Sequence, residues 1–196
     1  MFQESYKDLK YSFNNKSNVN SSDTTVLYMH MGLPKTGTSA LQAFFSKNRN
    51  LLLEKSIDYP IMGNFQRQVK GDIASGNAVF FAKAFLPKNN KSSLVNNKNK
   101  YIQEFIDKIK HSKSKYIVVS SEFLVGINIS SLFEIKNFLK SQLNIKIKIV
   151  YYMREQVSHL TSTYIQSVKR SNCTLFPEEY IRDSYQKKAF LYYHQL

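Results

Sequence analysis

The chain has 196 residues, of which 42% are hydrophobic, and a formal net charge of +14 with an isoelectric point near 9.7. This length suits one domain with a sizeable core, and the charge favours polyanionic partners such as nucleic acid, anionic membranes, acidic glycans or polyphosphorylated nucleotides. The single cysteine, Cys173, excludes an intrachain disulfide and a cysteine-based zinc cluster. No apolar run reaches the roughly 18 residues that predict a membrane-spanning helix.

Residues 1–23 are polar and lack the apolar centre of a signal peptide. We therefore expect a flexible leader over 1–23, one nucleotide-binding domain over 24–196, and a cytoplasmic location. The apolar run Val26-Leu27-Tyr28-Met29 predicts a first strand over about residues 25–31.

The loop at residues 32–39 reads Gly-Leu-Pro-Lys-Thr-Gly-Thr-Ser and lies between that strand and an amphipathic segment. Loops in this setting cradle phosphate with backbone N–H groups, hydroxyls and the positive end of a helix dipole. The glycine spacing is that of a nucleoside-triphosphate loop, but Thr38 occupies the lysine position and Lys35 lies inside the loop. We expect a phosphate-like ligand other than ATP bound in the ordinary way. The alternative is a turn that only caps the helix.

Further along the chain, strands and helices alternate. We expect a helix from about residue 38 with Leu41, Phe44 and Phe45 toward the core, a short strand at 57–60, helices at 77–86, 101–109 and 130–142, a polar loop at 87–99, and a buried strand at 116–119. This alternation predicts an α/β fold, a three-layer sandwich with a central parallel sheet, and the loop makes it similar to P-loop NTPases.

The last predicted strand covers residues 145–153, where isoleucines first alternate with lysines, and Arg154 follows it directly. A helix comes next, with one face formed by Val157, Leu160, Thr161, Tyr164 and Val168. An arginine at a strand end can grip phosphate oxygens, and a hydroxyl such as that of Ser162 on the following helix can add a further bond. The alternative is a surface arginine and an ordinary helix serine.

Ligands of parallel α/β sheets bind beyond the carboxyl ends of the strands. The loop at 32–39, the segment Ser120-Ser121-Glu122 and Arg154 all reach that edge. Glu122 is therefore a candidate general base, although an acid in this place also stabilises a helix start. His30 is a second candidate base, but its place inside the first strand favours a buried, hydrogen-bonded core histidine. The other histidines, His111, His159 and His194, show no ligand spacing.

The stretch Pro34-Lys35-Thr36-Gly37-Thr38-Ser39 resembles the 5′-phosphosulfate-binding loop of PAPS-dependent sulfotransferases, where PAPS is 3′-phosphoadenosine-5′-phosphosulfate. The longer run from His30 to Gln42 is similar to bacterial members that modify glycans. That family also carries a 3′-phosphate motif, a strand ending in arginine with a serine eight positions later, which Arg154 and Ser162 match.

The resemblance implies transfer of a sulfuryl group from PAPS to a hydroxyl of a carbohydrate acceptor. Lys35 and Glu122 would be the catalytic residues, Lys35 by neutralising the bridging oxygen and Glu122 by taking the acceptor's proton. The cofactor-binding residues would be Pro34, Lys35, Thr36, Gly37, Thr38, Ser39, Arg154 and Ser162. The expected partners are PAPS or its product PAP and a glycan, with no metal, nucleic acid or transmembrane segment.

The sequence departs from the family at its C-terminal part. The 26 residues after Arg170 contain no glycine, whereas many members carry a basic, glycine-containing loop there, and the final run Phe190–Leu196 resembles the middle of an amphipathic helix. We therefore expect a domain that is incomplete at its C-terminus. The alternatives are a non-catalytic PAP- or PAPS-binding remnant, a P-loop nucleotide or small-molecule kinase, and a basic nucleic-acid-binding protein. The kinase lacks support because no lysine follows Gly37 and no metal-binding aspartate ends a strand.

Overall fold

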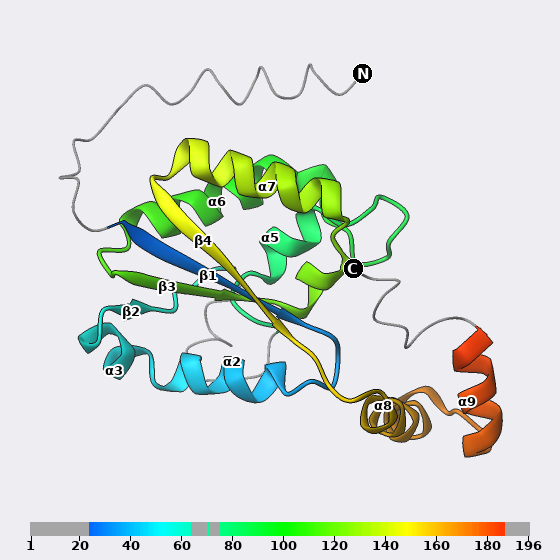
Figure 1. Cartoon of the computed structure of the whole chain (residues 1–196). Helices are drawn as coiled ribbons and strands as arrows, with labels where there is room; N and C mark the ends of the chain where they lie inside the picture. The colour runs from blue at the N-terminus through cyan, green and yellow to red at the C-terminus, as the bar shows by residue number, and fades with distance from the viewer. Residues whose placement is uncertain (1–23, 64–69, 71–74, 187–196) are drawn as a thin grey trace.

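The structure is a computed structural model that describes residues 24–63, 70 and 75–186. The leader predicted over 1–23 and the apolar run at 190–196 lie outside these residues. The chain folds as an α/β protein around a four-stranded, all-parallel sheet in the order β2-β3-β1-β4 (Figure 1). The strands are β1 (Thr25–Gly32), β2 (Ile57–Asp58), β3 (Tyr116–Ser120) and β4 (Ile145–Tyr152).

Helices connect and flank the strands. The α-helices are α2 (Thr38–Lys47), α3 (Arg49–Glu54), α5 (Val79–Ala84), α6 (Lys98–His111), α7 (Ile129–Gln142), α8 (Gln156–Ser171) and α9 (Pro177–Gln186). Two short 3₁₀ helices are η1 (Val95–Asn97) and η2 (Glu122–Gly126). The predicted strands and the helices near residues 38, 101, 130 and 156 are confirmed, and the helix predicted at 77–86 is shorter, as α5.

The apolar face of the sheet carries the core. In β1 the alternate residues Leu27, Met29 and Met31 are buried, and Ile117 and Val119 of the neighbouring β3 join them. Helices α5, α6 and α7 lie over this side, and α2 and α3 lie over the other (Figure 1). The short apolar strands predicted a parallel sheet with helices on its faces, and the arrangement of the helices confirms this.

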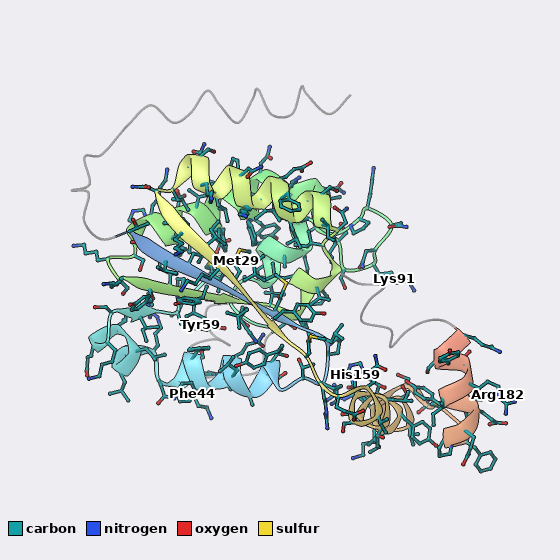
Figure 2. The ribbon with its side chains drawn as sticks, in the orientation of Figure 1. Met29, Phe44, Tyr59, Lys91, His159 and Arg182 are labelled. Carbon is teal, nitrogen blue, oxygen red and sulfur yellow. The ribbon has the colours of Figure 1, made fainter. Side chains whose placement is uncertain are left out.

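The opposite face of the sheet carries the buried polar residues His30 and Ser120, and the expected orientation of α2 is wrong for Phe44. Gln42 of α2 is only 5% exposed and donates to the Ser120 hydroxyl of β3. Phe44, on the same helix, is 53% exposed (Figure 2). Leu41 and Phe45 are half-buried, and the Phe45 ring stacks on the buried ring of Tyr59, in line with the expectation. Because the sheet presents hydrogen-bonding side chains here, an amide satisfies them and a phenyl ring would not.

Helix α8 leaves the end of β4 and lies beyond the sheet, with α9 beside it (Figure 1). The face that the sequence assigned to α8 is only partly covered, since Val157 is 70% and Val168 is 45% exposed. Leu160 and Tyr164 are half-buried, and the Tyr164 ring packs on Tyr180 of α9. The apolar spacing therefore predicted the helix α8 correctly. Among the described residues, no helix is both long and apolar enough to cross a membrane.

Candidate functional site

Three segments meet at the edge of the sheet where the parallel strands end. Strand β1 ends at Gly32, which pairs with Tyr152 at the end of β4, and β3 ends at Ser120, which pairs with His30. The loop at 33–37 follows β1, η2 follows β3, and Arg154 follows β4. This edge is the usual ligand-binding position in a parallel α/β sheet.

The first part of the loop is a tight turn. The Thr36 N–H donates to the Leu33 carbonyl over 3.3 Å, and the Thr36 hydroxyl donates to the same oxygen over 2.6 Å. Lys35 has a φ of 69°. Because Pro34 holds its own φ negative, a positive φ at the next residue makes this a type II turn, which normally has glycine where Lys35 stands.

Helix α2 begins directly after the turn. Its N-cap residue is Gly37, with a φ of 87°, which supplies no side-chain acceptor to the first N–H groups of the helix. A Cβ placed on Gly37 would meet nothing within 4 Å, so the backbone faces open space. Thr38 is buried and Ser39 is half-buried just behind it. The loop thus offers N–H donors at the positive end of a helix dipole, as an anion site requires.

Two residues from the β4–α8 segment hold the loop. Arg154 donates from Nη1 to the Lys35 carbonyl over 2.9 Å, and His159 donates from Nε2 to the Pro34 carbonyl over 2.8 Å. Arg154 is exposed, whereas His159 is 5% exposed near the start of α8 (Figure 2). The predicted proximity of Arg154 and the loop is confirmed. The contact of His159 was missed, since the sequence showed no ligand spacing around this histidine.

Ser162 lies on α8, three residues after His159, and is half-buried. Residues three apart on a helix share a face, so Ser162 and His159 lie on the same side of α8. The chain places Arg154 before this helix and Ser162 in its second turn. The contribution of Ser162 to phosphate binding stays a prediction.

Glu122 is the first residue of η2, at the end of β3. Its Oε1 accepts a hydrogen bond from the Ser75 hydroxyl over 3.2 Å, and its side chain is half-buried. Ser121 is the N-cap, since its hydroxyl accepts from the Phe123 N–H over 3.2 Å. The carboxylate therefore combines the two predicted properties, a place at the ligand edge and a place in the first turn of a helix.

A buried polar layer lies beneath this edge, between β1, β3 and α2. His30 is 3% exposed, and its Nδ1 lies 2.8 Å from the Ser120 hydroxyl, which also accepts from Gln42 Nε2 over 3.0 Å. Burial lowers the pKa of His30 below its ordinary value of 6.5. The prediction of a buried, hydrogen-bonded core histidine is confirmed. The remaining histidine nitrogen, Nε2, is buried with no hydrogen-bond partner.

Asn77 completes the polar layer from the segment before α5. Its Oδ1 accepts from the Ser120 N–H over 2.8 Å, and its Nδ2 donates to the Pro60 and Val118 carbonyls over 2.9 and 3.2 Å. The Tyr59 hydroxyl accepts from the Asn77 N–H over 3.2 Å, and burial raises the pKa of Tyr59 above its ordinary value. The network fixes the end of β3, from which Glu122 follows. The sequence gives no signal for it, because its members are far apart in the chain.

In the part of the chain that the structure describes, no three histidine, cysteine, aspartate or glutamate residues gather in a group that could hold a metal ion. Compared with the models of known protein families, the chain matches none, and comparison with curated proteins finds no match either.

Proposed function

We propose that the chain is a PAPS-dependent sulfotransferase, a three-layer sandwich of the P-loop NTPase kind that transfers a sulfuryl group to a carbohydrate hydroxyl. The observation that carries the proposal is the 2.9 Å hydrogen bond between Arg154 and the Lys35 carbonyl. It brings the residue expected at the 3′-phosphate next to the loop expected at the 5′-phosphosulfate. One nucleotide carrying both groups would then contact both segments.

The chemistry of the edge supports an anionic ligand of this type. PAP carries a 3′-phosphate of roughly −1.5 to −2 charge, and the loop offers Lys35, the uncapped start of α2 and the hydroxyls of Thr38 and Ser39. Arg154 adds a guanidinium, whose donors lie in a fixed fork that matches phosphate oxygens. The absence of a lysine after Gly37 favours this ligand over ATP.

In the proposed reaction, the acceptor oxygen attacks the sulfur of PAPS in line with the bond to the 5′-phosphate. A new S–O bond forms while the bond to the bridging oxygen breaks, and the electron pair leaves on PAP. Lys35 would stabilise the charge that grows on the bridging oxygen, and the loop would hold the nonbridging oxygens. Glu122 would accept the proton of the acceptor hydroxyl.

The experiment is a calorimetric titration of the full chain with PAP and, separately, with ATP. We expect PAP to bind in preference to ATP, and Arg154→Ala to weaken it by roughly 10- to 150-fold, the range for a hydrogen bond to a charged group. Lys35→Ala should weaken it as well. The matched control is Lys91→Ala, an exposed lysine on the loop before α6, well away from α8 in Figure 2, which should leave the affinity unchanged.

Each other result identifies an alternative. A preference of the folded chain for ATP would favour a kinase. Binding of PAP without release of PAP from PAPS in the presence of any glycan acceptor would favour a non-catalytic nucleotide-binding protein. An equal loss of affinity in Lys91→Ala and Arg154→Ala would indicate nonspecific attraction by a basic surface rather than a built site.

A further inference from the structure

The two central carbonyls of the loop turn are both held by residues that follow β4. Arg154 binds the Lys35 carbonyl, and His159 binds the Pro34 carbonyl. The Pro34 carbonyl belongs to the central peptide of the turn, the one between Pro34 and Lys35. His159 therefore contacts the single peptide group whose orientation distinguishes the two common turn types.

That orientation needs an external cause. A type I turn gives its third residue a φ near −90°, which suits lysine, whereas the type II turn seen here gives Lys35 a φ of 69°. A side chain makes the left-handed region unfavourable, so an isolated Pro-Lys turn would favour type I. Rotating the Pro34–Lys35 peptide would convert one turn to the other, and it would pull the Pro34 carbonyl away from His159.

We propose that His159 is a positioning residue, which holds the Pro34–Lys35 peptide in the type II orientation. The N–H and C=O of a trans peptide point in opposite directions, so binding the Pro34 carbonyl from α8 directs the Lys35 N–H away from α8. Helix α8 thereby sets which donors the loop presents. The inference rests on the proposed function only for the identity of the anion, because the turn belongs to the free chain.

The test is nuclear magnetic resonance on the isotopically labelled full chain without ligand. In a type II turn the Pro34 Hα lies close to the Lys35 amide proton and gives a strong nuclear Overhauser effect, whereas in a type I turn the effect is weak. We expect it to be strong in the wild type and weak in His159→Leu. It should be strong again in the double variant His159→Leu, Lys35→Gly, because glycine adopts a positive φ without strain.

The matched control is His111→Leu, since His111 also binds a backbone carbonyl, that of Asp107 over 2.6 Å, but within its own helix. It should leave the Pro34–Lys35 effect strong. A strong effect in folded His159→Leu would overturn the proposal, as would a weak effect in the wild type.

A second measurement on the wild type keeps the proposal testable if His159→Leu fails to fold. The Pro34 carbonyl can only accept, so Nε2 of His159 must carry a proton, and the ring nitrogen signals report this directly. An unprotonated Nε2 would overturn the proposal. If PAP binds the wild type, His159→Leu should weaken it by roughly twofold to tenfold. Failure of the wild type to bind PAP would count against the proposed function and not against the turn.

Discussion

Gly76 approaches the end of β3 more closely than any side chain could. A Cβ at this position would lie 1.9 Å from the Ser120 carbonyl oxygen and 2.9 Å from Gln42 Nε2, whereas ordinary contact begins at 3.4 Å. Gly76 also has a φ of 83°. The substitution Gly76→Ala must therefore displace one backbone by about 1.5 Å and strain another, in a region packed at crystal-like density.

The cost follows from three terms. A left-handed φ with a side chain costs about 1–2 kcal/mol, and overpacking costs about 1–3 kcal/mol. The Ser120 carbonyl also accepts from the Ala78 N–H over 3.1 Å, and the displacement should lose that hydrogen bond, worth about 1 kcal/mol. We expect Gly76→Ala to lower the free energy of unfolding by about 4 kcal/mol.

Gly37→Ala is the matched control, because Gly37 has a similar φ of 87° but open space around it. It should cost only the strain, about 1–2 kcal/mol. Alanine also reduces the freedom of the unfolded chain, but equally in both variants. Urea unfolding of the two variants, followed by circular dichroism, gives the difference. A difference below about 1 kcal/mol would refute the reasoning that crowding at Ser120 dominates.

Three further predictions concern the polar layer and the edge. Asn77→Ala should lower the free energy of unfolding, measured by urea unfolding, by roughly 3–5 kcal/mol, because it leaves buried backbone groups of β3 and Pro60 without hydrogen-bond partners. A cost under about 1 kcal/mol would contradict this. Because the pKa of His30 is lowered in the folded chain, the unfolded chain binds a proton first as the pH falls, and the free energy of unfolding should decrease as the pH drops below 6.5. The slope of the free energy of unfolding against pH should be smaller in His30→Gln. An unchanged slope would count against a buried neutral imidazole. Glu122→Gln should reduce sulfuryl turnover by about 10²–10⁴-fold with PAP affinity kept, in assays of PAP release, while Glu104→Gln changes neither; full turnover in Glu122→Gln would remove Glu122 as the base.

Local patterns predicted the fold well. The run Val26–Met29, the short strand near Tyr116 and the isoleucine alternation before Arg154 all form strands, because burial in a parallel sheet demands apolar or alternating residues. Parallel pairing then places the ends of these strands at one edge. The meeting of the loop with Arg154 could thus be predicted without knowing the strand order.

Contacts between distant polar side chains could not be predicted. Gln42 turns inward on α2 in place of Phe44 because it satisfies Ser120, a residue far along the chain. His159 reaches the Pro34 carbonyl only because α8 leaves the sheet beside the loop, and nothing in its spacing indicates that. Hydrophobic periodicity reports which residues avoid water, but not which buried hydrogen-bonding groups need a partner.

The most direct test of the central claim is the affinity of the wild-type chain for PAP, measured by calorimetry beside its affinity for ATP. The proposed function predicts saturable binding of one PAP per chain that depends on Lys35 and Arg154 and exceeds the binding of ATP. A folded chain that binds no PAP would contradict it.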